Sequence, residues 1–462
     1  MAKENAIKVL QELAAYARLK NARAMFFWQS EDSRFVRYAN SAVSLNTREI
    51  LTKLNVTVYG DRKKASSSIM TDAEDLDSMK KAVDKAVEML PFAAPLTYQP
   101  IVSAIPETVV SEEAYDSAVV SMTSSDIIAF VEEAVAGLET EDILLSGNIS
   151  SGVTEQAFMS TESTEAVYWR ATDIGITLVL SSLQDKWEVN AEQFTGWVKD
   201  LDAGALHNRL SWLTKQYTTA PSERVPEQPF TVVFGPAALA TYLDYFSWIG
   251  FNGGALKRGF AMMNADDIGQ KVLSDKFTLM EDPTLIETYP RPVDQFGRAR
   301  APRPIFDKGV FHGFVWRQSD ADEFGEKATG HDVTSLSVAL KGGDWKVNTI
   351  QEFAALPRDR DVLYIPYLHY TGLVNPTKGI VTGTSRFGPL WLKKDGSIAV
   401  PYNVRFTMSL KDLFGDNLRL VSEKTVPWGE SSHYRSRNPG ATIVPVLACV
   451  DNINIELSNQ SF

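Results

Sequence analysis

The start of the chain alternates between helical and strand-like spacings of apolar positions. Apolar residues on one face predict an amphipathic first helix with a single buried side: Ile7, Leu10, Leu13, Ala14 and Ala17. Short β-branched and aromatic runs then predict strands at residues 24–28, 35–38 and 54–59. Thr71 and Glu74 have the spacing of a capping box, so a second helix is expected to begin there and to end near Pro91.

The same order of elements recurs after a proline-rich, polar stretch at residues 91–113. One helix is expected at residues 125–138 and another at residues 201–217. Between them, apolar runs predict strands at residues 143–149, 157–160, 166–170, 175–181 and 187–190. Helix, antiparallel strands and helix, repeated once, indicate an α+β fold for the first half of the chain.

A segment rich in proline and charge, residues 221–229, predicts a domain boundary. We expect an N-terminal α+β domain at residues 1–225, and a further division of it near residues 91–120 stays open. Beyond the boundary, strand-like runs and Gly/Pro turns dominate. Residues 226–462 are therefore expected to form a β-rich C-terminal domain around a buried helix.

The expected buried helix follows a short apolar strand at residues 230–234 and a break at Gly235-Pro236. Residues 237–251 are apolar on nearly all sides, which predicts an enclosed helix. A strand that leads into such a helix is a layout of zinc hydrolases, whose helix carries two His ligands and a Glu that activates water. Here Asp244 is the only charged residue of the helix, and the helix has no His.

The sequence VVFGP at residues 232–236, the helix, and NGGALKRG at residues 252–259 together resemble the TldD/TldE family, also called PmbA or modulator of DNA gyrase. In that family, TldD carries His-Glu-x-x-x-His on this helix. Counted from VVFGP, those positions fall at Asp244, Tyr245 and Ile249. None of the three fits the motif, so the chain resembles the metal-free TldE/PmbA members.

Further motifs extend the resemblance over most of the chain. Thr329-Gly330-His331 resembles a Thr-Gly-His common in PmbA-type members. Gly253 and Gly254 are also motif positions, and we expect them to end the buried helix, because glycine tolerates positive φ. Other segments resemble the family at residues 271–284, 306–314, 379–398 and 410–414, whereas residues 392–394 and 407–409 depart from its pattern.

The resemblance implies a function. TldD and TldE form a cytoplasmic, zinc-dependent peptidase that cuts unfolded peptides, including a microcin precursor; TldD provides the metal site and TldE completes the enclosure around it. This chain is therefore expected to be a non-catalytic subunit with no cofactor of its own, while zinc is held by a TldD-like partner. The expected partners are that subunit or a second copy of this chain, together with an unfolded peptide.

Two other functions stay open at this point. One is an autonomous hydrolase that builds its active site from dispersed residues. The other is a protein-binding modulator linked to gyrase or to toxin–antitoxin control. Neither is supported by a P-loop or a G-x-S-x-G nucleophile motif, because the sequence contains neither pattern.

Composition narrows the setting and the partners. The 462-residue chain has 44% hydrophobic and 23% charged residues, as globular proteins do, and a formal charge of −12. The negative charge disfavours binding to nucleic acid, because phosphate contacts need clustered Lys and Arg. Cys449 is the only cysteine, and no stretch reaches the roughly 20 apolar residues that span a bilayer. No signal peptide is recognised, so a cytoplasmic location is expected.

Candidate metal ligands are sparse and scattered. No His-x-x-x-His pair occurs among the five histidines, which are His207, His312, His331, His369 and His433. A distant cluster of His312, His331, Asp332 and His433 stays open, although hydrogen bonding by His331 in a glycine turn is the favoured interpretation. Carboxylates are expected in a solvated loop at Asp320, Asp322, Glu323 and Glu326.

Overall fold

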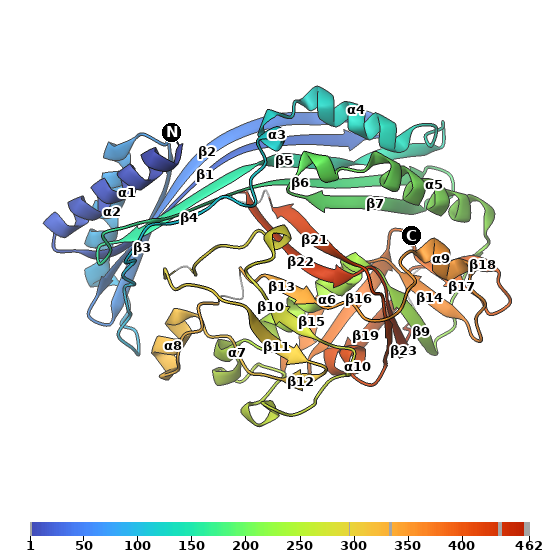
Figure 1. Cartoon of the computed structure of the whole chain (residues 1–462). Coiled ribbons are helices and arrows are strands. Elements are labelled where there is room, and N and C mark those ends of the chain that lie inside the picture. Colours follow the sequence, from blue (N-terminus) through green and yellow to red (C-terminus); the bar gives the residue numbers. More distant parts are fainter. Residues whose placement is uncertain (1, 295, 332–334, 433–436, 457–462) are drawn as a thin grey trace.

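The structure is a computed structural model that describes residues 2–294, 296–331, 335–432 and 437–456. Its first half contains a long, curved sheet that arches over the second half (Figure 1). The sheet order is β3-β2-β1-β5-β6-β4, and β7 pairs with β6. The strands are β1 Arg23–Ala39, β2 Ala42–Gly60, β3 Lys63–Thr71, β4 Val109–Ser111, β5 Ile143–Ser160, β6 Val167–Ser182 and β7 Glu188–Thr195.

The long strands β1, β5 and β6 each join two runs that the sequence pattern separates, so the prediction of separate strands was wrong there. Polar residues such as Glu31 and Asp173 continue these strands instead of breaking them. Their carboxylates are buried, and both bind Arg437, which comes from the other half of the chain. A distant partner therefore permits polar residues in the middle of a buried sheet.

Helices cover the outer face of the arch. They are α1 Ala2–Leu19 and α2 Leu76–Met89 at one end, and α3 Ser117–Ser121, α4 Ser124–Val135 and α5 Ala203–Thr219 at the other. Phe26 packs in the core of the first group and Val36 in that of the second, so both groups cover the same face of β1. The capping box predicted at Thr71 is wrong: α2 begins after Asp75, which accepts a hydrogen bond from Ser78 N at 3.0 Å.

The second half contains three sheets of mostly short strands. Their orders are β12-β11-β10-β13-β22-β21, β20-β23-β9-β14-β17-β18-β8 and β15-β16-β19. The strands are β8 Ser222–Glu223, β9 Pro229–Phe234, β10 Leu279–Glu281, β11 Arg303–Asp307, β12 Val310–Phe311, β13 Val338–Leu340, β14 Val362–Ile365, β15 Tyr367–Asn375, β16 Ile380–Arg386, β17 Leu390–Leu392, β18 Ile398–Pro401, β19 Arg405–Ser409, β20 Leu418–Val421, β21 Thr425–Ser432, β22 Asn438–Pro445 and β23 Ala448–Asn454.

Helix α6, Pro236–Ile249, lies in the largest core of this half. Phe246 is fully buried there, and its ring lies 5.6 Å from that of Phe277 and 5.5 Å from that of Phe306. The helix is not enclosed on every side, because Asp244 and Trp248 are exposed, Trp248 to 55%. The remaining helices are short: α7 Gly253–Lys257, α8 Gln318–Phe324, α9 Ile350–Ala355 and α10 Leu410–Phe414. The predicted α+β fold with a β-rich second half around a buried helix is confirmed.

The two halves share buried contacts. One hydrophobic core contains Leu210 and Leu213 of α5 together with Tyr364 of β14 and Leu390 of β17. The hairpin of β21 and β22 also rises toward the arched sheet (Figure 1). The domain boundary near residue 225 stays a prediction. None of the described helices is long and apolar enough to cross a membrane.

Candidate functional site

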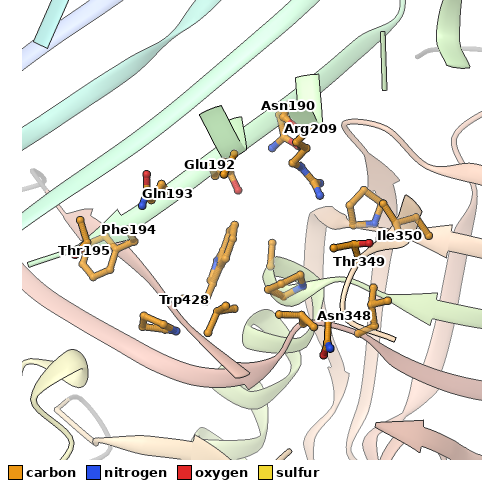
Figure 2. Close-up of a pocket in the computed structure, with 18 of the residues that line it drawn as sticks. Asn190, Glu192, Gln193, Phe194, Thr195, Arg209, Asn348, Thr349, Ile350 and Trp428 are labelled. Atoms are coloured by element: carbon orange, nitrogen blue, oxygen red, sulfur yellow. Dashed lines mark hydrogen bonds between the residues drawn. The ribbon is translucent and has the colours of Figure 1, made fainter. Parts of the chain in front are cut away.

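A cavity of about 700 Å³ lies between β7 of the arched sheet and the second half of the chain. Its other walls come from α5, the start of α6, the residues around the start of α9, and β21 (Figure 2). Aromatic side chains line much of it: Phe194, Trp197, Tyr289, Tyr364, Tyr367 and Trp428. Its size and aromatic walls are typical of sites that bind organic ligands.

Two sheet edges face this cavity. Among the described strands, β7 pairs only with β6 and β21 pairs only with β22, so each ends its sheet. Consecutive residues of both strands line the cavity, at 192–195 in β7 and 426–428 in β21. Consecutive side chains of a strand point to opposite faces of the sheet. A cavity that is lined by side chains from both faces therefore lies beside the edge of the strand. Backbone groups at such edges can pair with an added extended chain.

Arg209 of α5 is the only Arg, Lys or His among the described residues that line the cavity. Its Nε donates to Asn190 O at 3.0 Å, and its Nη1 donates to the Tyr364 hydroxyl at 3.4 Å. Burial alone lowers the pKa of Arg209, but Tyr364 and the nearby Glu192 outweigh burial, so the pKa lies above its usual value. Figure 2 shows the Arg209 and Glu192 side chains extending into the cavity from the arch side.

The three positions predicted from the family motif on α6 do not point to one place. Asp244 lines a smaller recess of about 230 Å³ that also contains Arg291. Burial raises the pKa of Asp244, although its side chain still reaches solvent at the edge of the recess. The Tyr245 hydroxyl donates to Thr371 Oγ1 on β15 at 3.0 Å. Ile249 is fully buried in the core of the second half.

This donor set does not fit zinc. Zinc binds thiolate, imidazole and carboxylate groups, and of the three motif positions only Asp244 offers one. Among the residues that the structure describes, no group of three or more His, Cys, Asp or Glu side chains is placed to hold a metal ion. In the cluster left open by the sequence, His312 is exposed and His331 is buried, whereas Asp332 and His433 lie outside the described residues.

His331 lies in a buried ionic cluster with Glu281 and Arg300. His331 Nε2 lies 2.7 Å from Glu281 Oε2, and Arg300 binds the other carboxylate oxygen. Ser337 N also donates to that second oxygen, at 3.1 Å. Burial by itself raises the pKa of Glu281, but His331 and Arg300 outweigh it and hold the pKa below its usual value. The cluster ties the segment around His331 to the end of β10.

The other motif residues pack around Trp316. Thr329 Oγ1 accepts a hydrogen bond from Trp316 N at 2.9 Å, and Gly330 takes a positive φ of 79°. A Cβ on Gly253 would lie 2.4 Å from the Trp316 ring, so only glycine fits there. Gly253 and Gly254 do not take positive φ, and they begin α7. The expectation that positive φ at these glycines ends the buried helix is therefore wrong, and close approach explains Gly253 instead.

The acidic segment near residue 320 is also more ordered than the sequence indicates. Asp320 lies on α8, is 4% exposed, and binds Arg258 Nη1 at 3.0 Å and Arg317 Nε at 2.9 Å. Glu323 binds Arg258 as well. The expected solvated loop is thus wrong for Asp320, because two guanidinium groups neutralise it in a buried position.

Sequence reasoning did not identify the residues of the large cavity. Phe194, Arg209 and Trp428 come from β7, α5 and β21, and they have no common spacing or motif. The apolar run at residues 187–190 indicated only the first part of β7. Neither the edge position of β7 nor that of β21 can be deduced without the sheet order.

Two family models match the chain. The model of PmbA/TldA metallopeptidase domain 1 matches residues 24–90, and that of the PmbA/TldA metallopeptidase C-terminal domain matches residues 227–456. Among solved structures, the chain is similar to TldE from Thermococcus kodakarensis, with a TM-score of 0.77 and 15% identity over 99% of this chain and 100% of that protein. No curated protein sequence matches the chain.

Two further structures share the fold. A proposed modulator of a DNA gyrase from Thermotoga maritima MSB8 has a TM-score of 0.75 and 13% identity over 97% of this chain and 99% of its own. A proposed modulator of DNA gyrase from Bacteroides thetaiotaomicron VPI-5482 has a TM-score of 0.70 and 17% identity over 97% of this chain and 98% of its own. From its domain matches and its fold, the chain belongs to the PmbA/TldD metallopeptidase family.

Proposed function

We propose that this chain is a metal-free, non-catalytic subunit of a TldD/TldE-type peptidase and that it shapes a cavity for unfolded peptides. In this proposal the zinc is held by a TldD-like partner, which forms a dimer with this chain. The other candidate for the second subunit of the dimer is a second copy of this chain. The complex is proposed to work in the cytoplasm, as the family resemblance implies.

The observation that carries the proposal is the composition of α6. Peptide hydrolysis needs an activated water or a nucleophile. At the family's motif positions, Tyr245 is hydrogen-bonded to Thr371 and Ile249 is buried in the core, so neither provides a ligand or a base. Asp244 alone is too few donors for a zinc site.

The cavity between β7 and β21 supports the peptide part of the proposal. An extended peptide can pair its backbone with a sheet edge, which gives affinity with little sequence preference. Trp428 and Phe194 supply apolar contact area beside the two edges. An unfolded chain offers an extended, unpaired backbone along its whole length, whereas a folded protein offers one only at its sheet edges, so the cavity favours unfolded substrates.

Peptide cleavage by the purified chain, alone and mixed with a TldD-like protein, tests the proposal. We expect no cleavage by the chain alone, and faster cleavage by the mixture than by the TldD-like protein alone. Trp428→Ala should weaken this stimulation. Phe92→Ala, a change at a side chain that is 89% exposed, serves as the matched aromatic control.

Two outcomes would favour the alternatives. Metal-independent cleavage by the chain alone that survives several purification steps would indicate an autonomous hydrolase. Absence of any stimulation, together with direct binding of a gyrase subunit, would indicate a modulator.

A further inference from the structure

We propose that the cavity between β7 and β21 selects peptides that place a basic side chain, Lys or Arg, at its Tyr289 end. This inference rests on the proposed function and specifies which peptides the cavity accepts. It follows from the distribution of charged and aromatic side chains along the cavity.

The charged residues that line the cavity are unevenly distributed. They comprise the carboxylates of Glu192, Asp200 and Glu287 and the guanidinium of Arg209. Arg209 is fixed by Asn190 O and the Tyr364 hydroxyl, and Glu192 acts on it electrostatically. This pair of opposite charges therefore largely cancels at one end of the cavity.

Asp200 and Glu287 lie near Tyr289 at the other end. Burial raises the pKa of Tyr289 well above its usual value, and the charges of Asp173, Glu287 and Asp200 add to this effect. Arg437 neutralises Asp173 through a bond of 2.6 Å. Among the described residues, no basic side chain forms an ion pair with Asp200 or Glu287, and the Asp200 carboxylate accepts only a long hydrogen bond of 3.5 Å from Thr195 Oγ1.

The guanidinium of Arg291 belongs to the neighbouring recess and does not line the cavity. Arg291 borders that recess, donates to Asn438 Oδ1 at 2.6 Å and lies over the Trp169 ring at 5.8 Å. Two exposed carboxylates thus face the Tyr289 end of the cavity, and the overall formal charge of −12 reinforces their field.

The aromatic wall at this end suits the rest of a basic side chain. Phe194 and Tyr289 pack edge to face with ring centroids 5.2 Å apart, and Trp428 lines the same cavity. A Lys or Arg stem can lie against these rings while its cationic group reaches the carboxylates. Cations also bind favourably to aromatic faces, Trp above all. An acidic side chain gains neither contact and is repelled.

The test compares three labelled peptides that differ at one position. Each is an unstructured peptide of about eight residues built from Ala, Ser and Gly, with a central Lys, Gln or Glu, long enough to lie along a strand edge. We expect the Lys peptide to bind about threefold to tenfold more tightly than the Gln peptide, and the Glu peptide to bind more weakly. Fluorescence anisotropy measures the dissociation constants at low salt, and added salt should reduce the difference.

Two double variants test whether the preference for the Lys peptide comes from the cavity carboxylates. Asp200→Asn with Glu287→Gln should abolish the preference for Lys, so that the Lys and Gln peptides bind equally. Glu139→Gln with Glu141→Gln removes the same charge at exposed positions outside the cavity lining and should preserve the preference. Equal binding of the three peptides, or a preference that persists in the cavity variant, overturns this inference and leaves the proposed function standing. Absence of binding by all three peptides overturns both.

Discussion

At the scale of single residues, buried charge occurs where several partners neutralise it. The Glu281 carboxylate is fully buried and contacts His331, Arg300 and the backbone N–H of Ser337. The Thr-Gly-His motif thereby gains a physical role in stability. Because a buried carboxylate without partners is costly, loss of one partner should be measurable in the free energy of unfolding.

His331→Ala should lower the free energy of unfolding by about 2–3 kcal/mol, because the buried Glu281 carboxylate loses one of its polar partners. Urea unfolding of the purified chain measures the change. His312→Ala is the matched control: His312 is exposed, so its replacement should change stability by less than about 0.5 kcal/mol. Equal effects of the two changes would argue against a structural role for His331.

The same cluster predicts a dependence of stability on pH. The pKa of Glu281 is lower in the folded than in the unfolded chain, so the unfolded state binds more protons in the acidic range. The stabilisation is fully present at pH values above the pKa of Glu281 in the unfolded chain. It is lost as pH falls through the pKa of Glu281 in the folded chain. Between about pH 5 and about pH 3, the parent should therefore lose more stability than Glu281→Gln. Parallel pH profiles of the two proteins would refute this assignment.

At the scale of elements, the β21–β22 hairpin contacts the arched sheet through Ala441, which packs with Trp169 and Phe194, and through a buried ion pair. Arg437 is fully buried, as is Asp173, and its Nε lies 2.6 Å from Asp173 Oδ1. Its backbone N–H also donates to Glu31. This hairpin supplies Trp428 to the cavity, so the ion pair helps to position one cavity wall.

Arg437→Met should destabilise the protein by about 3–5 kcal/mol, since it leaves Asp173 buried without its charged partner. Faster amide exchange in β21 and β22 should accompany the loss. Combining it with Asp173→Leu should recover part of the stability, because both charges are then removed. Arg360→Met, at an exposed pair with Asp359, is the control and should cost no more than about 0.5 kcal/mol. A hairpin as protected in Arg437→Met as in the parent would contradict this role.

Helix α6 allows a second test at this scale. A triple variant recreates the family's His-Glu-x-x-x-His motif on α6 through the changes Asp244→His, Tyr245→Glu and Ile249→His. We expect that it does not recreate a zinc site. The triple variant should bind zinc weakly and should be less stable than the parent, because Ile249 is fully buried and Tyr245 loses its bond to Thr371. Isothermal titration with zinc and thermal unfolding measure both effects. Tight zinc binding at an unchanged melting temperature would show that the helix retains a working metal cavity.

Local sequence patterns predicted α6, the first helix and the β-rich character of the second half. They failed where the deciding partner is distant. Asp173 and Arg437 are separated by 264 positions, so nothing near Asp173 indicated that its strand continues. The family resemblance located the three motif positions on α6. The different directions of their side chains depend on how α6 packs against β15 and the core, which the sequence does not show. The large cavity depends on which strands end their sheets, and sheet order is not encoded in local spacing.

At the scale of the whole molecule, an arched sheet lies over a β-rich half (Figure 1). Residues of both halves line the large cavity between two sheet edges. The fold is that of the PmbA/TldD family, and the described residues contain no cluster of metal ligands on α6 or elsewhere. The proposed function gives peptide admission to this chain and catalysis to a partner that carries zinc.

The central claim is that this chain lacks its own zinc site, and the zinc content of the purified protein tests it most directly. Elemental analysis follows dialysis against a mild chelator, with a TldD-like protein treated in parallel as the positive control. We predict far less than one zinc per chain here and about one zinc per chain in the control, because zinc needs several converging donors. About one tightly held zinc per chain of this protein would contradict the account.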